Sequence, residues 1–329
     1  MDRHRRGVWL VVVVTLPLLL SACATPAPQG TVSPWSYVET KLDPFWWYGI
    51  VGVAAAHDRA KGSGVTIAIV DTGILPGHQD IATILPGFAT CGTNPSDTSD
   101  NTNGHGTQLA GIALGKDPGP DFAASLPVIT KGVAPAAKLL PIKIDCGLVS
   151  ADSLVNGVQR AVDNNANVVL IAVGGYPAGN VHSRLGAIVG DEKYKNILFV
   201  VASVWDDTTY KPPAWTQLGN AILVAAMTLA NGAEVPFNDK RGTIWAPGRD
   251  IDTADIKYVS PTIPLINAPF SMQGTSPASA VVAGCAALIK ERKGSASSGE
   301  DIQKALTEKA VTRPGLPTSG RLDCNAAVP

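Results

Sequence analysis

The chain has 329 residues, of which 26 are lysine or arginine and 27 are aspartate or glutamate, so its formal net charge is −1. This balance, with only 16% charged residues, carries no electrostatic sign of a nucleic-acid partner, and we expect none. Hydrophobic residues make up 45% of the chain, and 33 glycines and 25 prolines supply many turns, which excludes a wholly disordered or fibrous protein. The length predicts one large globular domain.

The N-terminus is typical of an export signal. Three arginines within the first six residues precede an apolar run over residues 8–20, which is too short to span a bilayer comfortably. The sequence Leu-Ser-Ala-Cys that ends at Cys23 resembles a bacterial lipobox, in which the signal peptidase cuts just before a lipidated cysteine. We interpret residues 1–22 as a lipoprotein signal peptide and Cys23 as the lipid-bearing residue that anchors an exported protein to the membrane of the bacterial cell envelope. An ordinary secretory signal and an uncleaved short anchor are the open alternatives.

Residues 23–44 are rich in proline, threonine and serine, which predicts a tether between the lipid and a folded body over residues 45–329. Within that body, continuously apolar, β-branched runs predict buried strands at residues 65–70, 139–144, 168–173, 197–202 and 222–226. Helical spacing follows Ser150, covers residues 278–290, and resumes behind Ser298 as N-cap. This alternation predicts an α/β fold of three layers, with a mostly parallel central sheet and helices on both faces.

The body contains four further cysteines, and disulfides can form in an exported chain. Cys91 and Cys146 lie in turn-rich surroundings, so we favour that pair. Cys285 lies inside an apolar helical run and is equally compatible with a small buried hydrophobe, which would leave Cys324 free. No spacing of cysteine and histidine typical of zinc ligands is present, so we expect no zinc site.

Three polar motifs lie in places that match the rule that sites in such sheets gather at the carboxyl ends of the strands. Asp71 ends the first strand in Asp-Thr-Gly, His105 lies in Asn-Gly-His-Gly-Thr before a short apolar segment, and Ser276 lies in Gly-Thr-Ser-Pro-Ala at the start of the apolar helix over residues 278–290. A bilobal aspartic protease would need a second Asp-Thr/Ser-Gly, which is absent. An α/β-hydrolase would need Gly-x-Ser-x-Gly and the order Ser, Asp, His, which are also absent.

The order Asp71, His105, Ser276 on a parallel α/β scaffold, with Gly-Val-Ala-Pro from Gly132 and Ala-Pro-Gly from Ala246, resembles the subtilisin-like serine peptidases, or subtilases. The resemblance covers nearly all of residues 44–329 and implies a serine endopeptidase that cleaves protein or peptide substrates. Ser276 would be the nucleophile, His105 the general base and then acid, and Asp71 the residue that orients the imidazole. We expect a monomer.

One departure concerns the oxyanion hole. Subtilases usually place an asparagine there, in Ala-Gly-Asn after a strand, where this chain has Trp205 and Asp206 in place of the glycine and asparagine. An ionised carboxylate cannot donate a hydrogen bond, so Asp206 helps only when protonated. This favours a slower or more specialised enzyme. The alternative is a catalytically silent binding or scaffold lipoprotein with a subtilase-like fold.

The remaining expectations concern substrate and metal. Ala172-Val173-Gly174 replaces the usual Ser-Leu-Gly edge that pairs with substrate backbone, and Trp205 beside it would narrow a substrate pocket or pack on the surface. Asp80 falls where many subtilases place a calcium ligand, but one donor is far from the roughly 6–8 oxygens that calcium needs. The resemblance implies that no cofactor is required, and it leaves calcium binding open.

Overall fold

Buried β-branched strands form the centre of the protein in this computed structural model. The structure describes residues 45–100, 103–117, 130–173, 180–204, 211–230, 232–237, 241–254, 270–294, 296–316 and 319–329. The predicted signal peptide, Cys23 and the predicted tether lie outside the described residues, and every described residue belongs to one compact unit, Pro34–Pro329.

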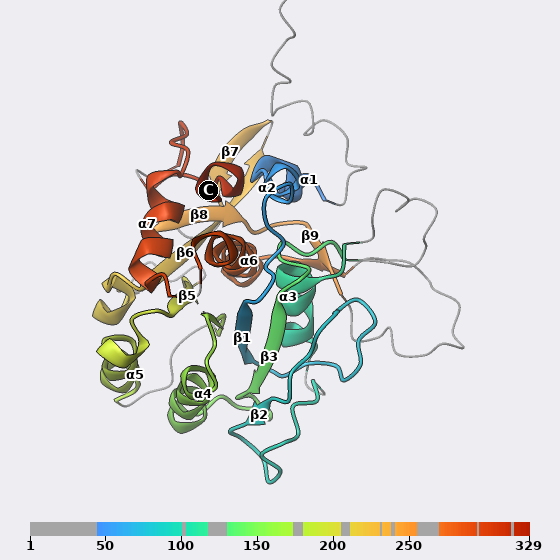
Figure 1. Ribbon diagram of the computed structural model, residues 1–329, viewed down its shortest axis with the longest axis vertical. Coiled ribbons are helices and arrows are strands. Elements are labelled where there is room, and N and C mark those ends of the chain that lie inside the picture. Colours follow the sequence, from blue (N-terminus) through green and yellow to red (C-terminus); the bar gives the residue numbers. More distant parts are fainter. Residues whose placement is uncertain are drawn as a thin grey trace, which may run out of the picture. The chain divides into compact units, whose positions relative to one another are not determined.

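The main sheet has the strand order β2-β3-β1-β4-β5-β6-β7, and β8 also pairs with β6 (Figure 1). Its strands are β1 (Thr66–Asp71), β2 (Phe88–Ala89), β3 (Lys138–Lys143), β4 (Val168–Ile171), β5 (Leu198–Ala202), β6 (Ala221–Ala230), β7 (Ala233–Pro236) and β8 (Ile244–Pro247). All pairings are parallel except that of β6 with β7. β9 (Ile251–Thr253) and β10 (Phe270–Met272) form a separate antiparallel pair.

The five predicted strands are confirmed, although most of their ends differ from the prediction by one to four residues. We expected a strand over residues 168–173, but β4 ends at Ile171, so Ala172 and Val173 follow the strand. The Ala172 carbonyl accepts a hydrogen bond from the Ser276 hydroxyl. Ala172 and Val173 therefore lie at the carboxyl edge of the sheet.

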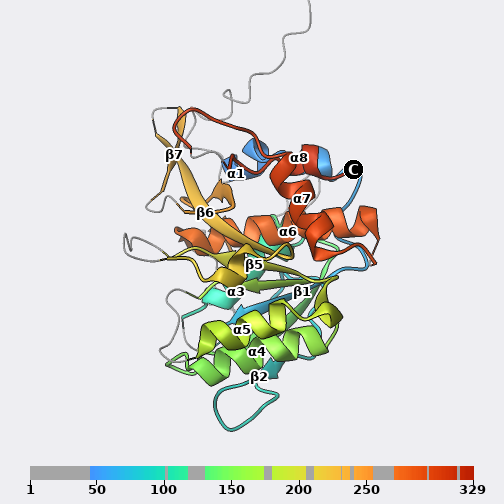
Figure 2. The same ribbon diagram turned by 90° about the vertical axis from the view of Figure 1, so that its left-hand side faces the viewer.

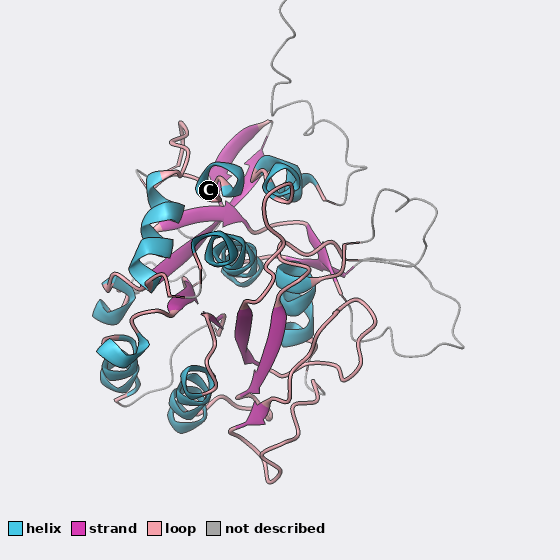
Figure 3. Ribbon diagram, viewed as in Figure 1, coloured by secondary structure: helices cyan, strands magenta, loops and turns pink. Residues whose placement is uncertain are grey.

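Helices cover both faces of the sheet (Figures 2 and 3). Within β1, Ile67 and Ile69 pack into one apolar core with α3 (His105–Leu114) and α6 (Thr275–Lys293). Ala68 and Val70 pack into a second core with α4 (Ala151–Asp163) and α5 (Val181–Val189). Because successive side chains of a strand point to opposite faces, this division confirms the predicted three-layer α/β fold.

Shorter helices complete the unit. They are α1 (Trp46–Ile50), α2 (Val53–Ala56), α7 (Gly299–Glu308), α8 (Cys324–Ala327) and the 3₁₀ turns η2 (Glu192–Tyr194) and η3 (Ala214–Gln217). The predicted N-cap is confirmed: the Ser298 hydroxyl accepts a hydrogen bond from the Asp301 N–H, and Asp301 accepts one in return. No helix among the described residues is long and apolar enough to cross a membrane.

Two disulfides link segments that are distant in the sequence. The favoured pair Cys91–Cys146 is confirmed, with Cα atoms 5.8 Å apart. Cys285, which we left open as a buried hydrophobe, pairs with Cys324 at the start of α8, and their Cα atoms are 5.7 Å apart. The sequence alone did not indicate this second pair, because the apolar surroundings of Cys285 resemble those of any helical core residue.

Candidate active site

Asp71 and His105 are joined directly at the carboxyl edge of the sheet. Asp71 is the last residue of β1, and His105 is the first residue of α3. The imidazole Nδ1 lies 2.8 Å from Asp71 Oδ1, and the Thr72 N–H donates to the same oxygen at 2.8 Å. A hydrogen bond at Nδ1 leaves Nε2 as the nitrogen that carries the free lone pair of the neutral ring. The pair therefore presents a basic nitrogen oriented by a carboxylate.

The environments of the two side chains differ in a way that suits this pairing. The side chain of Asp71 is 2% exposed, and its Oδ2 makes no hydrogen bond with any described residue, whereas that of His105 is 28% exposed. Burial of the imidazole works to lower the pKa of His105, but the charge and hydrogen bond of Asp71 outweigh it, with smaller help from Asp100 and Asp145. The net result is a raised pKa, so the imidazolium form is favoured at this position.

Glycine is required where β1 and α3 approach each other. A Cβ on Gly106 would lie 2.2 Å from the Gly73 carbonyl oxygen, and one on Gly73 would lie 2.3 Å from the Thr98 carbonyl oxygen. Gly73 also has a φ of 106°, which favours glycine. The close approach lets the Gly106 N–H donate to the Thr72 hydroxyl at 2.8 Å. The glycines of these two motifs therefore bring Asp71 within reach of His105.

Ser276 lies in the first turn of α6, beside the carboxyl ends of β4 and β5. Its Oγ donates to the Ala172 carbonyl at 3.1 Å, and the neighbouring Thr275 hydroxyl donates to the Ser203 carbonyl at 2.5 Å. Gly274, before the helix, has a φ of 120°, and its N–H donates to the Gly248 carbonyl at 2.7 Å. These bonds attach the start of α6 to the sheet edge where Asp71 also lies.

The nucleophile candidate is not hydrogen-bonded to the imidazole in this structure. Ser276 and His105 are both described, and the serine hydroxyl donates to Ala172 instead. Catalytic hydrogen bonds are often absent or long in enzymes without substrate, and a rotation about the serine Cα–Cβ bond moves the hydroxyl. The structure therefore unites Asp71 with His105 and brings Ser276 to the same sheet edge with its hydroxyl on Ala172.

Several predicted site residues cannot be placed. Gly174, Trp205 and Asp206 lie outside the described residues, as does Cys23. Ala172 is buried and hydrogen-bonded to Ser276, and Val173 is partly exposed. The substrate-binding and oxyanion assignments thus stay predictions, and only the Ala172 carbonyl among them has a described contact with a catalytic candidate.

Asp80 does not have the surroundings of a calcium site in the described part of the chain. It is 2% exposed, and its N–H donates to His78 Nδ1 at 3.2 Å. Among the described residues, no group of three or more His, Cys, Asp or Glu side chains lies close enough to hold a metal ion. Since calcium prefers several carboxylate or carbonyl oxygens, these residues alone do not fit the ion, and calcium binding stays an untested prediction.

Two residues beside the site escaped the sequence analysis. Lys143 ends β3 in register with Asp71, is buried, and donates from Nζ to the Ser99 carbonyl at 2.7 Å. Asp100 precedes α3 and accepts hydrogen bonds from its first turn. The sequence signal for Lys143 was a charged residue at the end of an apolar strand. The signal for Asp100 was an aspartate five positions before the histidine. Neither pattern is specific.

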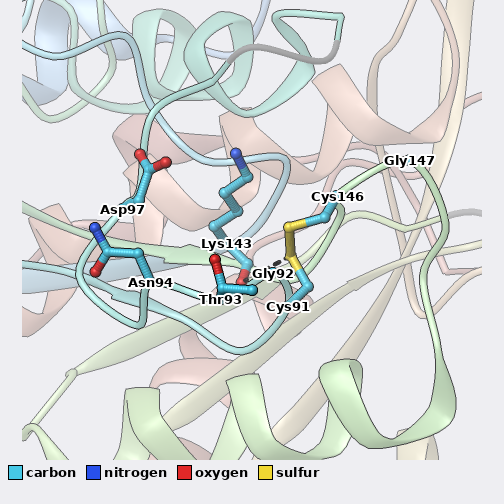
Figure 4. A pocket seen from close by; sticks show the side chains of 8 residues that line it. All are labelled: Cys91, Gly92, Thr93, Asn94, Asp97, Lys143, Cys146 and Gly147. Carbon is cyan, nitrogen blue, oxygen red and sulfur yellow. Dashed lines mark hydrogen bonds between the residues drawn. A yellow bond between two sulfur atoms is a disulfide. The ribbon is translucent and has the colours of Figure 1, made fainter.

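Lys143 also lines a polar cavity of about 560 Å³ (Figure 4). The Cys91–Cys146 disulfide forms another part of its wall, together with Asn94, Asp97 and neighbouring loop residues. None of Asp71, His105 and Ser276 lines it. The cavity is therefore separate from the candidate active site, although β3 adjoins both.

Comparisons with known proteins identify the family. The model described as "Subtilase family" matches residues 62–323. Thermitase of Thermoactinomyces vulgaris is 32% identical over 300 residues, which cover 88% of this chain and 99% of thermitase. Subtilisin Savinase of Lederbergia lenta is 31% identical over 295 residues, which cover 86% of this chain and 97% of that protein.

A solved structure agrees on the fold. Fervidolysin from Fervidobacterium pennivorans, described as a keratinolytic enzyme related to subtilisin, superposes with a TM-score of 0.67 at 22% identity. The match covers 86% of this chain and 45% of the fervidolysin chain, and at this identity it shows the fold alone. With the matching family model and the two relatives, the conclusion is that this chain belongs to the subtilase family and is a subtilisin-like serine endopeptidase.

Proposed function

We propose that Asp71, His105 and Ser276 are the catalytic triad with which this subtilase hydrolyses peptide bonds. The observation that carries the proposal is the 2.8 Å hydrogen bond between His105 Nδ1 and Asp71 Oδ1, which leaves Nε2 to act as the base. Asp71 holds the ring in this tautomer and stabilises the imidazolium. The raised pKa of His105 accords with that role, because a stronger base accepts the serine proton more readily.

In the first half of the reaction, the Ser276 hydroxyl exchanges its hydrogen bond with Ala172 for one with His105 Nε2. Oγ then attacks the substrate carbonyl as the imidazole takes its proton. Collapse of the tetrahedral intermediate transfers that proton to the leaving amine and forms the acyl-enzyme. A water molecule deprotonated by His105 hydrolyses the ester in the second half and restores Ser276.

The developing oxyanion needs hydrogen-bond donors. Ser276 lies in the first turn of α6, where backbone N–H groups and the positive end of the helix dipole favour negative charge. Asp206 is the second candidate donor, and it acts only in its protonated form. Removing such a donor lowers kcat by roughly 10²–10³-fold, so we expect the side chain at position 206 to have a large effect on kcat.

The Ala172-Val173-Gly174 edge is proposed to bind the substrate backbone, with Trp205 beside it. The support for this placement is that the Ala172 carbonyl already accepts a hydrogen bond and lies within 3.1 Å of Ser276 Oγ. When the serine turns toward His105, this carbonyl becomes available to a substrate N–H. A protein or peptide chain is the substrate class that such backbone pairing recognises.

We also propose that the enzyme works as a monomeric lipoprotein, exported and anchored to the cell envelope through a lipid on Cys23. The lipobox-like residues support the anchor, and two disulfides support an oxidising compartment. After cell fractionation, the Cys23→Ala variant should be absent from the membrane fraction. Mass spectrometry of the mature N-terminus should find a diacylglyceryl cysteine at residue 23, and an unmodified N-terminus elsewhere would contradict the anchor.

A silent scaffold protein is the second candidate function, because Trp205 and Asp206 alter the oxyanion region and the Ser276 hydroxyl is bonded to Ala172. Labelling of the full chain in detergent with a fluorophosphonate probe separates the two. We expect wild type to be labelled, Ser276→Ala to be unlabelled, and Asp206→Asn to be labelled faster. A folded wild type that resists the probe, with no rescue by Asp206→Asn, would establish the silent alternative.

A further inference from the structure

Asp100 supplies the N-terminal cap of the helix that begins with His105. The N-cap residue of α3 is Gly104, which has no side chain to accept the first free N–H groups of the helix. The buried Asp100 carboxylate replaces it. Oδ1 accepts the Gly104 N–H at 3.1 Å, and Oδ2 accepts the Thr107 N–H at 3.1 Å and the Thr107 hydroxyl at 2.8 Å.

The same residue is tied to the segment that follows Asp71. The Asp100 N–H donates to the Ile74 carbonyl at 2.9 Å, and the Ile74 N–H donates to the Thr98 carbonyl at 2.8 Å. The Thr107 hydroxyl in turn accepts the Leu75 N–H at 2.9 Å. Asp100 therefore connects the backbone after β1 to the first turn of α3, the two elements that carry Asp71 and His105.

The negative charge of Asp100 also acts on the imidazole. The charged groups that do so are Asp71 from β1, Asp100 from the loop before α3, and Asp145 from the loop after β3, and each raises the pKa of His105 against the lowering effect of burial. Asp145 makes no hydrogen bond with α3 among the described residues, so it acts by charge alone. Asp100 acts both by charge and by contact.

We propose that Asp100 is a positioning residue for peptide hydrolysis: its carboxylate fixes the first turn of α3 against the segment after β1 and thereby holds His105 in place beside Asp71. This inference rests on the proposed function of the triad. It assigns a role to a residue outside the three catalytic motifs. Small displacements of a catalytic group change rates strongly, so loss of the Asp100 cap should lower kcat through its effect on the position of His105.

The test compares kcat and the pH profile of kcat/KM for the full chain and its Asp100→Asn variant. An amide has one acceptor oxygen and no charge, so it cannot accept all three bonds. We expect kcat to fall by about 10–100-fold. The acidic limb of kcat/KM should move to lower pH, because removing the negative charge lowers the pKa of His105. Unchanged kcat and an unmoved limb would overturn the inference.

Two matched variants isolate the effect. Asp97→Asn makes the same change in the same loop at an exposed position, where the carboxylate accepts only the Ser99 N–H among the backbone groups described. We expect both readouts to match wild type. Asp145→Asn should move the acidic limb to lower pH with a smaller loss of kcat than Asp100→Asn, because Asp145 acts by charge alone. If Asp97→Asn lowers kcat as much as Asp100→Asn, the effect belongs to the loop as a whole and the inference is wrong.

Thr107→Val provides a second route should Asp100→Asn fail to fold. Valine is close in shape to the buried threonine, keeps the charge of Asp100, and removes both the 2.8 Å hydroxyl bond to Asp100 and the 2.9 Å bond from the Leu75 N–H. We expect a lower kcat with an unmoved acidic limb, and an unchanged kcat would contradict positioning through this contact. A wild type without hydrolysis would overturn the proposed function instead, so the two failures are distinguishable.

Discussion

The two ends of α6 are held in place by different kinds of interaction. At its N-terminus, Ser276 and Thr275 donate side-chain hydrogen bonds to backbone carbonyls at the sheet edge, and the serine is partly exposed. Toward its C-terminus, Cys285 is fully buried and bonded to Cys324 of α8, and Lys290 is 1% exposed. One helix therefore joins a polar, partly exposed start at the sheet edge to a buried, disulfide-linked segment around Cys285 and Lys290.

This difference separates activity from stability along the molecule. At the sheet edge, polar groups such as Asp71 are incompletely hydrogen-bonded, which suits chemistry and does not favour folding. At the opposite end of α6, burial and cross-links stabilise the chain and touch no reacting group. Substitutions at the first end should change rates, and those at the second should change the free energy of unfolding.

The largest effect should come from Asp71→Asn. An asparagine side chain favours the wrong tautomer of His105, so we expect kcat/KM to fall by about 10⁴-fold with little loss of unfolding free energy. The control is Asp301→Asn in α7, where the carboxylate accepts hydrogen bonds from the Ser298 N–H and hydroxyl. That variant should lose about 1 kcal/mol of stability and no activity. Equal activity in both variants would refute the division.

The next effect concerns a buried ion pair between β7 and the C-terminal segment. Glu234 in β7 contacts Arg321 at 3.1 Å, both side chains are 3% exposed, and Arg313 approaches the same carboxylate at 3.2 Å. Glu234→Gln leaves the Arg321 charge buried without its counter-ion, which should lower the unfolding free energy by about 3–5 kcal/mol.

Urea unfolding measures this change, and kcat per folded molecule should stay constant. Glu300→Gln is the matched control, because the Glu300–Lys304 pair is 54% exposed on both sides and should contribute less than about 0.5 kcal/mol. A similar loss in both variants would show that burial does not determine the strength of the Glu234 pair.

The two disulfides allow the same kind of cross-link to be compared at a partly exposed and at a buried position. They close loops of similar length, 39 and 55 residues, so chain entropy alone predicts similar stabilisation, about 4 kcal/mol each. Burial differs: Cys285 and Cys324 are fully buried, whereas Cys146 is exposed. Alanine at both buried cysteines adds a cavity and should cost more than alanine at Cys91 and Cys146.

Limited reduction provides an independent measurement on the native protein. Dithiothreitol followed by alkylation and peptide mass mapping should modify Cys91 and Cys146 first, because a reductant must reach the sulfur atoms. Simultaneous modification of all four cysteines would mean that the protein unfolds globally before either bond is reduced.

The smallest effect should be the pH dependence that Lys290 imposes. Burial lowers the pKa of Lys290 to about 8, with partial compensation from Asp301, and Nζ donates to the Asn196 and Ser297 carbonyls. Between about pH 8 and the unfolded value of 10.5, the unfolded chain holds a proton that the folded chain has released. The free energy of unfolding should therefore rise with pH in this window.

The two carbonyl bonds favour the ammonium form, so we expect a total rise of about 1–2 kcal/mol rather than the full linkage value. Lys290→Met should remove the rise, as measured by urea unfolding at pH 8 and pH 10. Lys304→Met, at an exposed position of α7, should leave it in place. If the unfolding free energy of Lys290→Met still rises between pH 8 and pH 10, another titrating group causes the rise.

Much of the architecture was predictable from local patterns. Continuous apolar runs indicated β1, β3, β4, β5 and β6, since strands buried on both faces are apolar at every position. Ser298 indicated the start of α7, because a serine before an apolar-periodic run is a common cap. The short strands β2 and β8 escaped, as their few residues show no pattern outside the sheet that completes them.

For the candidate site, the sequence by itself determined which chemical groups are available and in what order: a carboxylate at the end of a strand, an imidazole before a short apolar segment, a hydroxyl at the start of a helix, and glycines beside them. Residue type and spacing suffice for that, because short motifs encode local backbone geometry. Only the tertiary structure decided that Asp71 bonds His105, that Ser276 rests on Ala172, that Cys285 pairs with Cys324, and that Asp100 caps α3. Each of these contacts joins segments through hydrogen bonds or sulfur atoms whose directions depend on how strands and helices pack, and no local sequence pattern specifies those directions.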